Sequence, residues 1–295
     1  MRLQGIDFLR GIAVIFVLFR HGENQSIIQK AGWAGVDLFF VLSGFLVSGL
    51  LFKEYKKNHT IDFKKFLIRR GFKIYPAFYV FLGFSLIFSY FFYNEQHKIQ
   101  FVLSEIFFMQ SYFPNIFSHT WSLAVEEHFY IALCVLVYLA VYFKKLDNPK
   151  LIISIIFILI ITVFLNRYYL VYSNREKPFF PFVATHLRLD GIIIGTLISY
   201  IYYFTSFPKF FTSHIHKFLI ASCFLIAPIF IFKAGGYIMN LYGLFSISIG
   251  FGILVLASIQ TSIVSMLLLI PGIRPVYNFV VYVGIYSYSI YLWHI

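Results

Sequence analysis

The sequence contains eight apolar runs, and their length restricts the possible folds more than any other feature. A helix needs about 20 consecutive apolar residues to cross the hydrocarbon core of a bilayer, and most of these runs approach or exceed that length. They lie at residues 6–21, 34–52, 75–93, 122–143, 151–170, 183–204, 217–233 and 241–262. We therefore predict an all-α, polytopic transmembrane helix bundle of about eight to ten spans.

The composition agrees with a membrane protein. Hydrophobic residues make up 60% of the 295 residues and charged residues only 12%, whereas soluble domains carry about 25% charged residues. The net charge is +12, and the cations cluster between the apolar runs, where anionic lipids attract them. We therefore expect membrane lipids, and no nucleic acid, as partners. Cys134 and Cys223 lie inside apolar runs and predict small buried side chains rather than disulfides.

Three segments do not fit a complete span. Residues 99–113 contain Glu105 and predict a re-entrant or interfacial piece. Residues 263–284 are interrupted by two prolines and a glycine, and predict a broken helix or a surface segment. Residues 286–295 begin a further aromatic helix with about half of the roughly 20 residues that a crossing needs. We expect a single membrane domain, residues 1–295, truncated within its C-terminal helix and weak as a catalyst.

The Lys and Arg residues of the loops indicate the orientation. Segment 53–73 contains eight of them, whereas the loop after the third run contains only Lys98. Segment 144–150 adds three more, and the three cations within 167–177 weaken the contrast. The N-terminal residues lack the pattern of a cleavable signal peptide. We predict a retained first span with a cytoplasmic N-terminus, which brings its other end to the outer side.

The first run carries Asp7, Arg10 and His21. Ionisable residues inside membrane segments are costly and are usually functional. Arg10 and His21 are eleven residues apart, so on a helix they share one face and lie about 16 Å apart along the axis. An arginine could hold an anion there while the histidine transfers protons. The structural alternative is an Asp7–Arg10 ion pair with an interfacial histidine.

The second run carries Asp37 and several glycines, including Gly44 on the same helical face. The glycines allow close helix packing. A carboxylate in an apolar span needs a partner, and the Arg or His of the first run is nearest along the chain.

Residues 69–76, RRGFKIYP, place Arg69, Arg70 and Lys73 directly before the third run. They can anchor the chain at the cytoplasmic surface. They can also bind phosphates, for which the planar guanidinium of arginine is well suited.

Residues 119–130, HTWSLAVEEHFY, bring Ser122, Glu126 and Tyr130 to one helical face, with Glu127 about 100° away. One of the two carboxylates could orient or activate a histidine. The histidines of this segment, at 119 and 128, are more typical of hydrogen-bonded interface positions than of metal ligands.

Two later motifs carry further candidates. In RLDGIIIG, residues 188–195, Arg188 and Asp190 point to nearly opposite sides of a helix and should contact different neighbours. In SYSIYLWH, residues 287–294, a hydroxyl, a phenol and an imidazole lie on one helical stripe and could belong to a site. The alternative is that the aromatic residues form a belt at the membrane interface. That stripe consists of Ser287, Tyr291 and His294.

The residues alone leave an enzyme and a transporter open. The sequence has no HExxH, GxSxG, P-loop or GxGxxG motif, and we expect no metal. Several ionisable residues within the membrane fit either a catalytic site or a substrate pathway.

The order of the motifs resembles the integral-membrane acyltransferase 3 family, bacterial O-acetyltransferases that modify cell-surface and other sugars. The resemblance covers nearly the whole chain and rests on six motifs in family order. They are FLRGIAVIFVLFRH, GVDLFFVLSGFL, RRxxKIYP, WSLAVEEHFY, RLDGIIIG and SYSIYLWH.

The resemblance implies transfer of an acyl group from cytoplasmic acyl-CoA, most commonly acetyl-CoA, to a sugar hydroxyl. His21 then matches the essential histidine, Arg10 its partner arginine, and Glu126 the glutamate of the WSLxxE motif. We expect Glu126, or else Asp37, to lie beside His21 and to fix its tautomer. The basic triplet that begins at Arg69 matches the motif that meets the donor, with a lysine where an arginine is usual. Family members normally continue beyond the YLWH motif.

We thus expect an acyltransferase in the bacterial cytoplasmic membrane, acting on a saccharide that is either at the cell surface or lipid-linked. The alternative is a transporter or flippase for a lipid-linked saccharide. The sequence specifies neither the sugar, nor the acyl group, nor a covalent acyl-histidine step, nor the oligomeric state.

Overall fold

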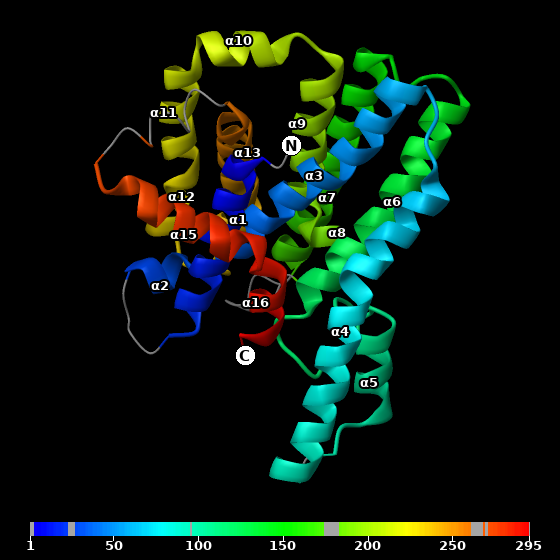
Figure 1. The fold of residues 1–295 in the computed structure, drawn as a ribbon, viewed down its shortest axis with the longest axis vertical. Helices are drawn as coiled ribbons and strands as arrows, with labels where there is room; N and C mark the ends of the chain where they lie inside the picture. Colours follow the sequence, from blue (N-terminus) through cyan, green and yellow to red (C-terminus); the bar gives the residue numbers. More distant parts are fainter. Residues whose placement is uncertain are drawn as a thin grey trace.

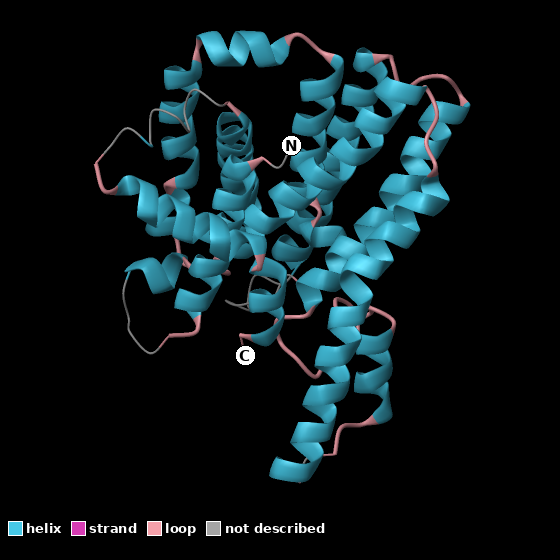
Figure 2. Cartoon of the chain, in the orientation of Figure 1, coloured by secondary structure: helices cyan, strands magenta, loops and turns pink. Residues whose placement is uncertain are grey.

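The computed structural model describes residues 3–22, 27–94, 96–173, 183–260, 268 and 271–294. These residues form helices joined by turns and loops, and contain no strand (Figures 1 and 2). The predicted all-α class is therefore confirmed. Each of the eight predicted spans coincides with helix along most of its length.

The helices vary widely in length. They are α1 (Gln4–Arg20), α2 (Ile27–Ala31), α3 (Ala34–Asn58), α4 (Phe63–Tyr93), α5 (Ile99–Ile106), α6 (Trp121–Tyr142), α7 (Pro149–Ser173), α8 (Thr185–Arg188), α9 (Asp190–Phe204), α10 (Phe207–Ser213), α11 (Ile215–Ile226), α12 (Pro228–Ile231), the π-helical turn η1 (Met239–Gly243), α13 (Leu244–Ile259), α15 (Ile273–Ile285) and α16 (Ser287–Trp293).

Five of the described helices are long and apolar enough to cross a membrane: α3, α4, α6, α7 and the continuous segment Met239–Ile259. A sixth is added if α9 and α10, which are bent by 99° relative to each other, count as one span. The shorter apolar helices Ile215–Ile231 and Ile273–Ile285 fall below this length, and α1 has 17 residues. The protein is thus a multi-pass membrane protein, with fewer full-length spans in its described part than the eight to ten predicted.

Two segments outside the predicted spans have defined positions. Helix α5 has eight residues, too few to cross a bilayer. Its Glu105 is fully buried and accepts a hydrogen bond from the Thr120 hydroxyl at 3.0 Å. Helix α15 begins after Gly272, whose φ of 78° is left-handed. Most of the predicted segment 263–284 is therefore helix, and residues 263–267, 269 and 270 lie outside the described part.

Most of the lysines lie at helix ends and in turns on one side of the bundle. The ends of α3 and α4 that flank their connection, the α6–α7 turn and α10 are all in the upper part of Figure 1. The end of α1 and the start of α6 face away from them. This arrangement has the sidedness that the loop charges predict, and the cytoplasmic location of the basic end remains a prediction.

Helices α3 and α9 pack at the centre with almost no space between their backbones. A Cβ atom added at Gly44 would lie 2.0 Å from the Ile192 carbonyl oxygen, and one at Gly195 would lie 2.1 Å from the Val41 carbonyl oxygen. Such distances are not sterically possible, so each glycine is needed where the other helix crosses. The predicted role of the glycines in close packing is confirmed.

Two buried ion pairs tie this centre to its neighbours. Arg188 of α8 donates to Asp37 of α3 at 2.7 Å, and Arg167 of α7 donates to Asp190 of α9 at 3.0 Å. Arg188 and Asp190 thus contact different neighbours, as their opposite directions on a helix predict.

Two other expectations for these charges are wrong. The partner of Asp37 is Arg188, 151 positions away in the sequence, and not a residue of the first span. Arg167 is fully buried inside α7 and is not a loop cation, because α7 continues to Ser173. Of the two cysteines, Cys134 is buried as expected, whereas Cys223 is exposed.

We expect Arg167→Leu to lower the free energy of unfolding by about 3–5 kcal/mol, because Asp190 would keep a buried charge without its partner. The melting temperature of the purified protein in detergent measures this loss. Lys56→Leu is the matched control, because its ion pair with Asp147 is about half exposed and should contribute less than about 1 kcal/mol. The double variant Arg167→Leu/Asp190→Leu should recover most of the loss. Equal stability of Arg167→Leu and Lys56→Leu would contradict this account.

Candidate functional site

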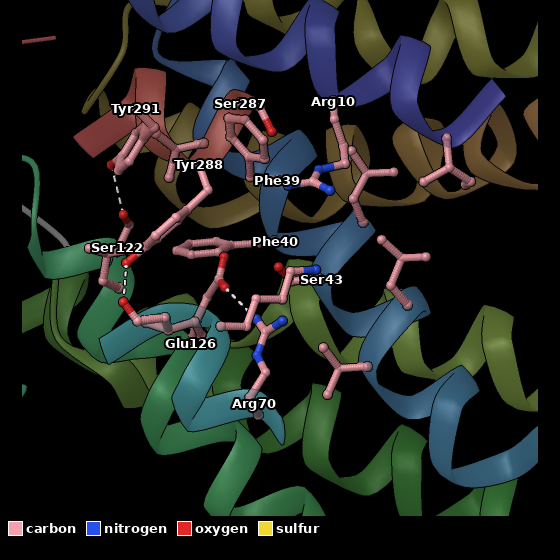
Figure 3. Close-up of a pocket in the computed structure, with 18 of the residues that line it drawn as sticks. Arg10, Phe39, Phe40, Ser43, Arg70, Ser122, Glu126, Ser287, Tyr288 and Tyr291 are labelled. Atoms are coloured by element: carbon pink, nitrogen blue, oxygen red, sulfur yellow. Dashed lines mark hydrogen bonds and ion pairs between the residues drawn. The ribbon is translucent and has the colours of Figure 1, made fainter. Parts of the chain in front are cut away.

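A cavity of about 530 Å³ lies between α1, α3, α4, α6 and α16 (Figure 3). It unites predicted site residues from four of the six motifs. These are Arg10, Arg70, Lys73, Ser122, Glu126, Glu127, Ser287 and Tyr291. Asp7 of the first run also lines the cavity, and two further polar residues of the lining, Ser43 and Tyr288, were not among the candidates.

The side chains of Arg10 and Arg70 point into the cavity from opposite walls, α1 and α4 (Figure 3). Phe39 and Phe40 of α3 lie between them and provide apolar surface. The lining combines three basic side chains with three acidic ones on a mainly apolar wall, so the cavity contains charged groups without a strong excess of either sign. Such a site can bind a ligand with both anionic and apolar parts.

The closest set of contacts joins Arg70, Glu126 and Tyr130. The Tyr130 hydroxyl donates to Glu126 and accepts a hydrogen bond from Arg70, whose guanidinium also lies 4.2 Å from the centre of the Tyr130 ring. Arg70 Nη2 is 3.6 Å from Glu126 Oε2. Tyr130, which is fully buried, thus holds both charged groups in place at the cavity wall.

A second set of hydrogen bonds connects α6 with α16. The Tyr291 hydroxyl lies 2.7 Å from the Ser122 hydroxyl and donates to the carbonyl oxygen of His119 at 2.9 Å. On the other side of α6, Glu127 accepts a hydrogen bond from the Tyr75 hydroxyl at 3.0 Å. These bonds fix α16 against α6, so that Tyr291 forms one end of the cavity.

Three histidines gather beyond Tyr291, outside the cavity lining. The ring centres of His21 and His294 are 5.0 Å apart, and those of His119 and His294 are also 5.0 Å apart. The Tyr291 ring lies 5.3 Å from His294. Burial, together with the nearby His294, lowers the pKa of His119 to about 4. His119 is therefore neutral at physiological pH.

The expected pairing of His21 with a carboxylate is wrong. Glu126 is engaged by Arg70 and Tyr130, and Asp37 by Arg188. Within the described residues, His21 has a ring contact with His294 and no hydrogen bond or ion pair to an acidic group. The physical reason is that an arginine satisfies a buried carboxylate better than a neutral imidazole does.

The other candidates are divided among different places. Asp37, Arg188 and Asp190 belong to the buried ion pairs and do not line the cavity. Arg69 is exposed on α4 and does not line it either, although its neighbour in sequence does. No group of three or more His, Cys, Asp or Glu side chains in the described part of the chain is arranged to hold a metal ion.

Sequence reasoning missed several residues of the site. Tyr75 is part of the RRGFKIYP motif and Tyr288 is part of SYSIYLWH, so both could have been found from the motifs that contain them. Ser43 directly precedes Gly44 on α3 and lines the cavity. The sequence favours a hydrogen-bonded interface position for His119. Its ring contact with His294 connects it with the group of histidines near His21.

These features define a polytopic membrane protein with a charged site inside its helix bundle. The chain belongs to the acyltransferase 3 family, since the family's acyltransferase domain matches residues 3–295. It is 31% identical to the peptidoglycan O-acetyltransferase OatA of Listeria monocytogenes over 99% of this chain and 49% of the relative. It is 28% identical to the O-acetyltransferase OatA of Staphylococcus aureus over 99% of this chain and 50% of the relative.

The chain thus spans about half the length of these curated relatives. No solved structure matches it.

We expect Tyr130→Phe to lower the free energy of unfolding by about 1–3 kcal/mol, because Arg70 and Glu126 each lose a charge-assisted hydrogen bond. Tyr138→Phe on the same helix is the control, because Tyr138 is 52% exposed and its hydroxyl should matter little. Melting temperatures of the two variants in the same detergent provide the comparison. Equal values would mean that the Tyr130 hydroxyl does not hold the pair together.

Proposed function

We propose that the protein is a membrane O-acyltransferase that moves an acetyl group from acetyl-CoA to a hydroxyl of a cell-surface or lipid-linked sugar. The site would lie in the bacterial cytoplasmic membrane, with the donor entering from the basic end of the bundle. The family and the names of the relatives support the class of reaction. The main structural support is that Tyr291 of α16 lines the cavity and lies against His294, which in turn contacts His21.

The cavity suits the donor better than the acceptor. Coenzyme A combines phosphates with a long and largely uncharged arm. Arg10, Arg70 and Lys73 offer cations for the phosphates, and the apolar residues of α3 offer surface for the arm. Tyr291 separates this cavity from the three histidines, so a thioester that reached it would lie next to His294 and His21.

The proposed chemistry needs a base, because a sugar hydroxyl is a weak nucleophile. His21 takes the proton of the hydroxyl as its oxygen attacks the thioester carbonyl carbon. The carbon–sulfur bond then breaks, and coenzyme A leaves as a thiolate that accepts the proton from His21. The products are the acetylated sugar and free coenzyme A. In this proposal Glu126 positions Arg70 and does not act on His21.

The first test is acetyl transfer by the full chain reconstituted in lipid nanodiscs, with radiolabelled acetyl-CoA as donor and N-acetylglucosamine oligomers as acceptor. We expect release of free coenzyme A that depends on the oligomer, and label in the sugar. His21→Ala should lower turnover by at least about 10²-fold, the typical contribution of a general base, without changing the melting temperature. Movement of a lipid-linked sugar without any acetyl transfer would support a transporter instead.

The second test separates the two interpretations of the basic motif. Lys73→Gln should raise the apparent KM for acetyl-CoA by about 10-fold or more with a smaller effect on kcat, because one charge-assisted contact to the donor is lost. Arg69→Gln is the control, since Arg69 does not line the cavity. If both variants change the donor KM equally, the motif acts as a membrane anchor and the donor binds elsewhere.

A further inference from the structure

The three histidines at the outer end carry an inference about how the base is oriented. We propose that His294 is the positioning residue for His21: its Nε2 atom accepts a hydrogen bond from the ring N–H of His21, in the place where many enzymes use a carboxylate. This inference rests on the proposed function, because it assigns His21 as the base.

The tautomer of His294 follows from its contact with the backbone. Its Nδ1 atom lies within hydrogen-bond distance of the Tyr291 carbonyl oxygen. A carbonyl oxygen can only accept, so Nδ1 must carry the hydrogen, and in a neutral ring Nε2 then carries the lone pair. Nε2 is buried and has no hydrogen-bond partner within the described residues. A buried acceptor of this kind needs a donor.

Two imidazoles lie equally close to His294, with ring centres 5.0 Å away: His21 and His119. His119 donates through Nε2 to the Leu292 carbonyl oxygen, so in the neutral ring its Nδ1 carries no hydrogen. His21 is therefore the ring that can supply the donor. Its ring centre lies 5.0 Å from that of His294, with the planes at 68°. A ring nitrogen lies about 1.1 Å from the ring centre, so two imidazoles joined by a bond of about 2.9 Å have centres about 5 Å apart. The separation is thus the one that an N–H···N bond requires. The His21 side chain is exposed, so its ring is free to adopt the orientation that this bond needs.

The helix end explains why His294 is held in this tautomer. Helix α16 ends at Trp293, and the last carbonyl groups of a helix have no N–H partner within it. His294 donates to one of them, and His119 uses the next: its Nε2 atom lies 3.3 Å from the Leu292 carbonyl oxygen. The bonds of Tyr291 to α6 keep both carbonyl groups in place. Two histidines from different parts of the chain therefore have their tautomers fixed by one helix end.

Neutral rings suit this role. Burial lowers the pKa of His294 and, together with its neighbours, that of His119. His21 lies next to these two neutral imidazoles and near the Arg20 cation, which disfavours the charged form of His21. A proton taken from the sugar is therefore passed on readily to the thiolate. His294 orients the ring through its lone pair, and the other nitrogen of His21 faces the acceptor.

Two substitutions of His294 separate orientation of His21 from a purely structural role. The amide oxygen of Gln can occupy the position of Nε2, and the amide nitrogen of Asn can occupy that of Nδ1. If His294 positions His21, His294→Gln should keep kcat within about 10-fold of the wild type, whereas His294→Asn should lower it by about 10²-fold. Both variants should leave the KM for acetyl-CoA unchanged. If His294 only caps the helix end, Asn keeps the hydrogen bond to Tyr291 and the order of the two variants is reversed.

A spectroscopic measurement tests the tautomer without any turnover. The wild-type protein labelled with ¹⁵N-histidine in nanodiscs should give a signal of a neutral ring with hydrogen on Nδ1, and this signal should disappear in His294→Gln. Hydrogen on Nε2 of His294 would overturn the inference. If the wild type transfers no acetyl group, the proposed function fails, and the inference fails with it even where the tautomer is the expected one.

Discussion

Charged groups inside an apolar bundle must be paired, and this requirement governs most of the structure. Taking an ion out of water costs several kcal/mol, which only a close partner of opposite charge and further hydrogen bonds offset. The pairs Asp37–Arg188 and Arg167–Asp190 meet this requirement at the centre, next to the tight crossing of α3 and α9. They join α3, α7, α8 and α9 into one unit against which the remaining helices pack.

The same requirement determines which groups are left for chemistry. Glu126 is engaged by Arg70 and Tyr130, so it is not available to a histidine. His21, the proposed base, lies beside two imidazoles that are fixed by a helix end, with the Arg20 cation nearby. In the proposed function, separating the cavity for the donor from the group of histidines makes physical sense, because phosphates need cations whereas a base works best when its neighbours are not protonated.

Local features such as helices could be predicted from the sequence, whereas most contacts between residues of different helices could not. Apolar runs and glycines depend on neighbours along the chain, so the helices and the close packing at Gly44 were predicted. Helix periodicity also predicted that Arg188 and Asp190 have different partners. Connectivity was a poor guide to the partner of Asp37, since nearness in sequence does not decide which helices touch. Likewise no pattern distinguishes Arg69, which is exposed, from Arg70, which lines the cavity.

The sequence by itself determined an all-helical membrane chain, the positions of its helices and the set of ionisable residues within them. It could do so because hydropathy and helix period act over one or two turns. Only the tertiary structure decided which of those residues meet: that five of the six motifs line one cavity, that the carboxylates pair with arginines, and that His21 faces His294. These contacts join helices far apart in the chain, and they depend on how the helices cross, which is set by packing and by the cost of an unpaired buried charge.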